Sequence, residues 1–198
     1  MMKMMFLPGA GGSAAFWRPV ANQVAPDRPR QFLSWPGLGN EPSDPNLRGM
    51  DDFVSMVLAA LWEPADLIAQ SMGGLIALRV ALAAPDRVRR IVLTATSAGV
   101  PVAGLGGEDW RADYKRDYPG AASWITEVSE DLSPRLPSVA APCLLIWGDA
   151  DPVSPLAVGE RLLRLLPHAE LHVVRGGGHD LAVTHTAEVA RLIASHLR

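Results

Sequence analysis

Short apolar runs alternate with amphipathic stretches along most of the chain. Six of these runs predict buried strands, at residues 3–7, 31–35, 66–69, 88–94, 143–147 and 171–174. Apolar positions at helical spacing predict helices over residues 14–25, 50–61, 73–84, 155–166 and 186–197. Strands that alternate with helices form right-handed βαβ units and a mostly parallel sheet. We therefore expect an α/β fold, a three-layer α/β/α sandwich with a sheet of about six strands.

The helix expected over residues 155–166 has the sharpest local start signal. Ser154 stands immediately before it, and Pro155 would occupy its first turn. Serine is a favoured N-cap, and proline is tolerated at the first helical position because its missing N–H has no partner there. We expect Ser154 to cap this helix.

Composition narrows the class of protein further. The 198 residues, 48% of them hydrophobic, predict one domain over residues 1–198. The net charge of −3 is spread along the chain without a basic stripe, so nucleic acid is not an expected partner. A single cysteine, Cys143, cannot form an internal disulfide and is expected to be buried. No signal peptide or bilayer-spanning run is recognisable, which predicts a cytoplasmic protein without a membrane partner.

Ser71 is the first candidate for chemistry. It lies between the apolar run 66–69 and the helix expected over 73–84, with Ala69 and Gly73 two residues to either side. Small residues at those positions allow a sharp strand-to-helix turn that exposes the serine hydroxyl above the sheet. A serine that merely caps the helix is the alternative interpretation.

His179 is the second candidate. It follows the run 171–174 after the turn Gly176-Gly177-Gly178, which allows the chain to leave the strand sharply. An imidazole can accept a serine proton near neutral pH and return it to a leaving group. The other histidines occupy positions typical of ordinary loops, strands or helices.

Asp151 is the third candidate, and Asp149 is its rival in the same turn after residues 143–147. A buried carboxylate there could orient the imidazole and stabilise its protonated form. We favour Asp151 and expect Asp149 to serve the turn itself. Three such residues at carboxyl ends of strands, in the order Ser, Asp, His, indicate a nucleophilic triad. Ligand spacings typical of a metal site are absent from the sequence, and no cofactor is expected.

These motifs resemble those of the α/β-hydrolase superfamily over nearly the whole chain. Residues 69–73 resemble its nucleophile elbow, with Ala69 where glycine is usual. Residues 7–12 resemble its loop after the third strand, with Pro8 in place of histidine, and residues 35–39 resemble its next glycine-rich loop. The resemblance implies an oxyanion hole formed by the backbone N–H groups of Ala10 and Met72.

The resemblance also implies a difference in the sheet. Family members usually have two strands before the one expected at residues 3–7, and these are not recognisable here. The exposed sheet edge that this leaves could support a homodimer.

Residues 97–141 are expected to form a short cap or lid insertion, as occurs at this point in the superfamily. Their aromatic residues could wall a pocket, or could simply pack on the core. Residues near the same end of the sheet would complete the apolar pocket, which we expect to include Gly9, Phe16, Trp17, Leu38, Trp110 and Trp124.

Together these features predict a serine hydrolase that cleaves a small ester or thioester through an acyl-serine intermediate. A lyase or acyltransferase on the same fold is the enzymatic alternative. A ligand-binding protein on a hydrolase scaffold is the alternative from another class.

Overall fold

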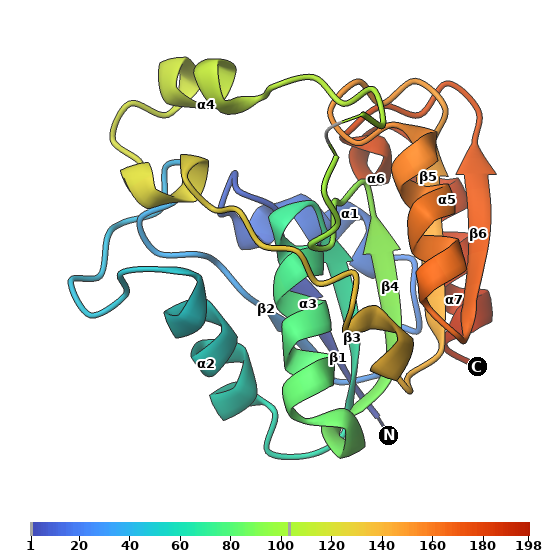
Figure 1. Cartoon of the computed structure of the whole chain (residues 1–198). Helices are drawn as coiled ribbons and strands as arrows, with labels where there is room; N and C mark the ends of the chain where they lie inside the picture. Colours follow the sequence, from blue (N-terminus) through green and yellow to red (C-terminus); the bar gives the residue numbers. More distant parts are fainter. Residues whose placement is uncertain (1, 103) are drawn as a thin grey trace.

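The computed structural model describes residues 2–102 and 104–198, and its centre is a six-stranded sheet (Figure 1). The strands lie in the order β2-β1-β3-β4-β5-β6, and every adjacent pair is parallel. The α/β fold with a six-stranded parallel sheet is thus confirmed. The strands are β1 (Lys3–Leu7), β2 (Arg30–Phe32), β3 (Ala65–Gln70), β4 (Val88–Thr94), β5 (Cys143–Gly148) and β6 (Ala169–Val174).

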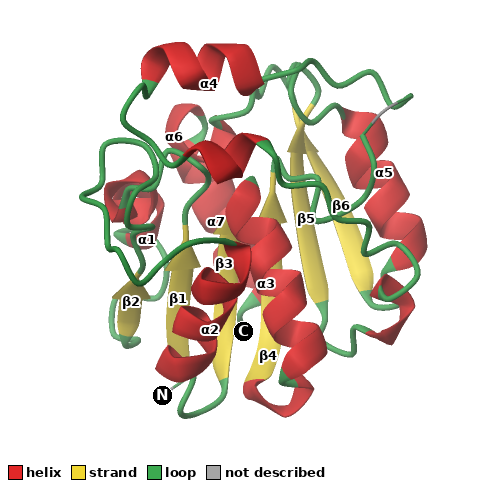
Figure 2. Ribbon diagram, turned by 60° about the vertical axis from the view of Figure 1, so that its left-hand side comes forward, coloured by secondary structure: helices red, strands yellow, loops and turns green. Residues whose placement is uncertain are grey.

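Helices cover both faces of this sheet, which gives three layers (Figure 2). The first layer contains α2 (Met50–Ala60), α3 (Met72–Ala83) and α5 (Leu156–Leu165). The opposite layer contains α1 (Arg18–Ala21), α6 (Leu181–Thr184) and α7 (Thr186–His196). A further helix, α4 (Arg111–Asp117), lies beyond the carboxyl ends of the strands (Figure 1). Short 3₁₀ turns complete the structure at Ala14–Trp17, Pro85–Arg87, Ser123–Thr126 and Leu136–Ser138.

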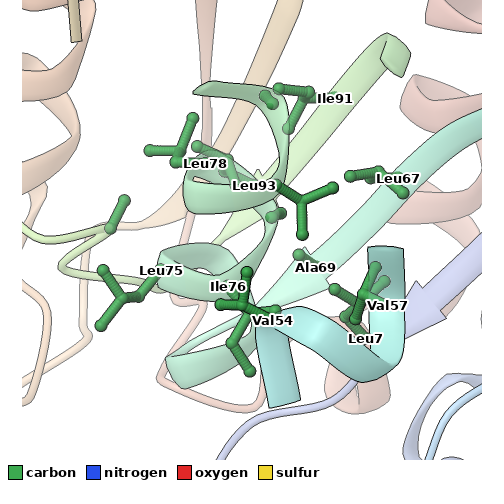
Figure 3. Close-up of a cluster of buried hydrophobic side chains, with 14 of the residues drawn as sticks. Leu7, Val54, Val57, Leu67, Ala69, Leu75, Ile76, Leu78, Ile91 and Leu93 are labelled. Carbon is green, nitrogen blue, oxygen red and sulfur yellow. The ribbon is translucent and has the colours of Figure 1, made fainter. Parts of the chain in front are cut away.

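Two hydrophobic cores follow from the alternation of side chains along each strand. In β1, Met5 and Leu7 point into the core beneath α2 and α3, whereas Met4 and Phe6 point into the core beneath α1 and α7. Figure 3 shows part of the first core, where side chains of the sheet meet those of α2 and α3. Fully burying one such side chain contributes about 1.5–3 kcal/mol to the free energy of folding. The many buried side chains of the two cores therefore hold the strands, and the residues at their ends, in fixed positions.

The helix expected over residues 14–25 is shorter and broken. A 3₁₀ turn covers Ala14–Trp17, and α1 ends at Ala21. Pro19 is the physical reason, because its ring would clash with the carbonyl of Ala15 in one continuous helix. Near the expected end, Ala25 precedes a proline and adopts a φ of 36°, which is outside the helical region.

The expected N-cap of α5 is also wrong. Pro155 occupies the cap position, and the helix begins at Leu156. Ser154 instead donates its backbone N–H to Asp151 and accepts a hydrogen bond from Trp147 at its carbonyl. Its side-chain oxygen is buried and has no hydrogen-bond partner among the described residues. The loop that positions Asp151 therefore determines the conformation of Ser154.

Cys143 is buried at the start of β5, as its apolar neighbours predict. Burial raises the pKa of its thiol to about 12, so the reactive thiolate is scarce at neutral pH. Among the helices in residues 2–102 and 104–198, none combines the length and the apolar character required to cross a membrane.

Candidate active site

Ser71 occupies a strained turn between β3 and α3. Its φ of 51° and ψ of −123° lie in a region that residues with a side chain rarely adopt. Such a conformation costs on the order of 1–3 kcal/mol and persists only where the surroundings enforce it. Thr94 and Thr96 of the neighbouring segment provide part of that enforcement. The Ser71 N–H donates to the Thr94 carbonyl at 3.1 Å, and the Thr96 hydroxyl donates to the Ser71 carbonyl.

Gly73 explains why the turn requires small residues. A Cβ atom at this position would lie 2.5 Å from the carbonyl oxygen of Pro8 and 2.6 Å from that of Leu7. Both oxygens belong to backbone and have little room to move. The start of α3 therefore lies directly against the loop that follows β1, which brings Ser71 close to residues 8–12.

His179 reaches Ser71 from the loop after β6. Its Nε2 atom lies 3.1 Å from the Ser71 hydroxyl oxygen, and about a quarter of its side chain is exposed. Gln70, directly before the serine, donates a long hydrogen bond of 3.4 Å to the His179 carbonyl. At the base of the two loops, a Cβ on Gly148 would lie 1.9 Å from the Gly177 carbonyl oxygen, so the loops after β5 and β6 approach closely.

Asp151, rather than Asp149, lies against the imidazole. Its two carboxylate oxygens are 3.0 and 3.2 Å from the Nδ1 atom of His179. Asp151 also accepts the backbone N–H groups of Val153 and Ser154, and its side chain is fully buried. Asp149 is exposed and accepts the N–H of Gly176 at 2.6 Å, a hydrogen bond that holds the neighbouring turn. The structure thus aligns Ser71, His179 and Asp151 in one chain of hydrogen bonds.

Ala10 and Met72, the residues expected to supply the oxyanion hole, both line the same cleft. Within the part of the chain that the structure describes, neither backbone N–H group donates to a protein acceptor. Met72 is the first residue of α3, where N–H groups have no partner inside the helix and the helix dipole is positive. Both groups are therefore free to bind an oxygen that gains negative charge.

The cleft beside Ser71 has a volume of about 1060 Å³, and its walls include three residues expected from the sequence, Gly9, Phe16 and Trp110. The other three expected residues do not line it. Trp17 is buried in the core beneath α1 and α7, where its Nε1 atom donates to the Leu7 carbonyl. Leu38 is fully buried in the core, and Trp124 packs edge-on against Phe53.

Described residues of segment 97–141 form part of the walls of the cleft, and Tyr114 of α4 joins this segment to the rest of the molecule. The Tyr114 hydroxyl donates to the Ala10 carbonyl at 2.8 Å and accepts the Gly39 N–H at 2.9 Å. Burial raises the pKa of this hydroxyl, so it keeps the proton that it donates. The sequence indicated an aromatic stretch here, but no signal distinguished Tyr114 from its aromatic neighbours.

Among the described residues, no group of three or more His, Cys, Asp or Glu side chains lies together in a way that could hold a metal ion. The buried carboxylate, the imidazole and the hydroxyl are instead arranged for proton transfer between neighbours.

Comparison with known proteins assigns the chain to a family. A model of the alpha/beta hydrolase family matches residues 4–192. The chain belongs to this family. It is 26% identical to a 2-hydroxy-6-oxononadienedioate/2-hydroxy-6-oxononatrienedioate hydrolase from Dechloromonas aromatica. The alignment covers 96% of this chain and 83% of the relative. A pimeloyl-[acyl-carrier protein] methyl ester esterase from Neisseria meningitidis is 24% identical, with 96% of this chain and 91% of the relative covered.

Solved structures have the same fold as this α/β-hydrolase. A meta-cleavage product hydrolase from Pseudomonas fluorescens superimposes with a TM-score of 0.82 at 20% identity, covering 100% of this chain and 90% of that one. A thermophilic esterase from Thermogutta terrifontis also gives 0.82, at 17% identity, with 100% and 90% covered. The alignment with the Dechloromonas relative extends over 248 positions, which is more than the 198 residues of this chain. That relative therefore contains internal residues that this α/β-hydrolase lacks.

Proposed function

We propose that this α/β-hydrolase is a serine esterase or thioesterase that acts through an acyl-serine intermediate. The observation that carries the proposal is the chain of hydrogen bonds from Ser71 through His179 to the buried Asp151. A serine hydroxyl is a weak nucleophile on its own. A base within hydrogen-bond distance, itself oriented by a carboxylate, is the arrangement that activates it.

In the first half of the reaction, Ser71 Oγ attacks the carbonyl carbon of the substrate while His179 Nε2 accepts its proton. Asp151 stabilises the imidazolium that forms and keeps Nδ1–H directed toward itself. The carbonyl oxygen becomes an oxyanion that the N–H groups of Ala10 and Met72 bind. One such donor typically contributes about 2.7–4 kcal/mol to lowering the barrier. The imidazolium of His179 completes this half by giving its proton to the departing alcohol or thiol as the bond to the acyl carbon breaks, which leaves Ser71 acylated.

In the second half, a water molecule enters, and Nε2 of His179 removes its proton as its oxygen attacks the acyl-serine. Collapse of the second oxyanion releases the carboxylic acid and returns the proton to Ser71. This sequence uses only groups of the chain and water.

The relatives support hydrolysis without naming one substrate. The Neisseria relative is named as a methyl ester esterase, which supports cleavage of an ester. The Dechloromonas relative is named for a dioate, a compound with two carboxylates. We propose an ester or thioester as the bond cleaved here.

The test is reaction with an uncharged fluorophosphonate probe, followed by digestion and mass spectrometry to identify the labelled residue. Hydrolysis of a short-chain nitrophenyl ester is measured on the same preparation, with Ser71→Ala as the matched control. We expect a label on Ser71, ester hydrolysis, and loss of both in the Ser71→Ala variant.

Other outcomes identify the alternatives. Labelling of Ser71 with acyl transfer to an added alcohol, but no release of the acid, would favour an acyltransferase. Labelling without any ester cleavage or acyl transfer would favour a lyase. Folded protein that is not labelled at Ser71 would overturn the proposal and leave a ligand-binding protein as the better explanation.

A further inference from the structure

The walls of the cleft carry an excess of negative charge. Among the described residues that line it, six have a charged side chain at neutral pH, and five of these are carboxylates. The five acidic residues are Glu108, Asp109, Asp117, Glu130 and Asp180, and the one basic residue is Arg111. They come from two parts of the chain, since Asp180 directly follows His179 whereas the others belong to segment 97–141.

Arg111 is already engaged by the protein. Its guanidinium lies 3.0 Å from the carboxylate of Asp109, and its Nε atom donates to the Thr126 carbonyl at 2.8 Å. Hydrogen bonds from Arg111 lower the pKa of Asp109, which keeps that carboxylate ionised. A substrate carboxylate would have to compete with Asp109 for this guanidinium.

Two nearby cations outside the cleft are each shared between two carboxylates. Arg116 lies 2.9 Å from Asp117 but also 2.5 Å from Asp113. Arg79 lies 3.7 Å from Glu130 and closer, at 2.6 Å, to a carboxylate of α2. Each arginine therefore neutralises only part of the charge of the carboxylate that lines the cleft, which is Asp117 for Arg116 and Glu130 for Arg79.

Glu108 and Asp180 have no ion-pair partner among the described residues. The loop that carries Glu108 is fixed to the Asp151 loop, because its backbone N–H donates to the Pro152 carbonyl at 2.7 Å. Asp180 is the N-cap residue of α6, and its carbonyl accepts the N–H groups of Val183 and Thr184. Both carboxylates are exposed and line the cleft that contains Ser71.

The deeper wall of the cleft is apolar. Met50, Leu75, Val100 and Ile125 line it, and each is at most 8% exposed. An uncharged group loses little by entering such a surface, whereas a carboxylate would lose its hydration there. The one basic side chain among the described lining residues, Arg111, is already paired with Asp109. The apolar interior and the acidic residues of the cleft thus both disfavour a substrate that carries an additional carboxylate.

We propose that the cleft selects esters or thioesters that are uncharged or cationic away from the scissile bond, and that it disfavours those with an additional carboxylate. This inference rests on the proposed esterase function of the same site. Clustered charges of one sign raise the local concentration of counter-charged molecules and lower that of like-charged ones, and salt weakens both effects.

The experiment compares three nitrophenyl esters whose acyl chains have equal length and end in a methyl, a carboxylate or a trimethylammonium group. Each kcat/KM is divided by the rate constant for hydroxide-catalysed hydrolysis of the same ester, which corrects for intrinsic reactivity. A second series has the same end groups on the alcohol, so that either orientation in the cleft is tested. We expect the carboxylate esters to react roughly tenfold more slowly than the neutral ones at low salt, and the difference to shrink in 0.5 M salt, where the screening length falls below about 5 Å.

Variants locate the source of the preference. Neutralising Glu108 and Asp180 together (Glu108→Gln with Asp180→Asn) is expected to narrow the difference between neutral and carboxylate esters about threefold. Glu127→Gln is the matched control, since it removes one exposed carboxylate of the same segment that does not line the cleft. It should leave the ratio unchanged.

Equal or faster corrected rates for the carboxylate esters in both series would overturn the charge preference. A preference that is insensitive to salt and to the double variant would overturn its assignment to the cleft carboxylates. In both cases the neutral ester is still hydrolysed and Ser71 is still labelled. Failure of the proposed function differs from either, because then no ester reacts and the uncharged probe does not label Ser71.

Discussion

The two ends of the sheet each bury an aspartate, but they surround it with different partners. At the amino end of β3, Asp66 is fully buried and accepts hydrogen bonds from Arg28 and from both Nε and a terminal nitrogen of Arg89, the latter pair at 2.8 and 2.6 Å. Beyond the carboxyl end of β5, Asp151 is also buried but faces His179 and two backbone N–H groups.

The difference separates structural from chemical use of a buried charge. Asp66 meets two permanent cations that come from different segments, and Arg89 also binds the Leu197 carbonyl at the end of the chain. Asp151 meets an imidazole whose charge can change during a reaction, and its other partners are neutral. Removing the first carboxylate should lower stability, and removing the second should lower activity.

The largest effect is expected for Asp151→Asn. The amide can still accept the Val153 and Ser154 N–H groups, so the fold should persist. It no longer stabilises an imidazolium on His179, and kcat should fall roughly 10⁴-fold in the nitrophenyl ester assay. Asp149→Asn is the matched control, with a change of less than about threefold expected because its carboxylate is exposed and accepts the Gly176 N–H. Comparable losses in both variants would contradict the assignment of Asp151.

Asp66→Asn should have the opposite profile. It leaves two arginines without a full counter-charge, and breaking a buried pair costs about 3–5 kcal/mol. Because both arginine side chains are partly exposed, we expect a value near the lower end, about 3 kcal/mol, which corresponds to a fall in Tm of about 6–12 °C. Urea unfolding measures the change in free energy. The kcat of the folded fraction should stay within about twofold of the parent, and a large fall in kcat would mean that the two ends of the sheet are coupled.

A smaller and mixed effect is expected for Tyr114→Phe, which removes the hydroxyl between Ala10 and Gly39. Losing this group leaves two backbone groups unpaired, at a cost of about 1–3 kcal/mol in unfolding free energy. Since the Ala10 segment also carries a proposed oxyanion donor, kcat should fall about three- to tenfold with KM changing less. Tyr118→Phe is the neighbouring control, because no hydrogen bond involves its hydroxyl among the described residues. A rise in KM alone would indicate that Tyr114 shapes only the cap.

Much of this comparison could be predicted from the sequence, because strong local signals coincide with the strand ends. The apolar runs predicted all six strands, and the turns after three of them contained Ser71, Asp151 and His179. The proximity of the three side chains follows from the parallel sheet, whose carboxyl ends share one edge.

Side-chain direction could not be predicted in the same way. Phe16 and Trp17 are adjacent in one tight turn and therefore point in different directions, so only Phe16 reaches the cleft. The hydrogen bonds of Tyr114 join residues 75 and 104 positions apart, and no local pattern specifies such contacts. The ion pairs of Asp66 could not be predicted either, since a lone carboxylate in an apolar strand does not indicate which arginines will lie beside it.

The all-parallel strand order has a consequence for how this molecule acquires its reactivity during folding. Every strand pairing bridges a crossover, and His179 lies 108 positions from Ser71 in the chain. Contacts of such long range form late and slowly, because closing a large loop costs chain entropy before the new contact can stabilise the chain. We expect that a nascent or refolding chain stays unreactive until β6 has docked. The rate at which an active-site probe begins to react should then report the completion of the native topology.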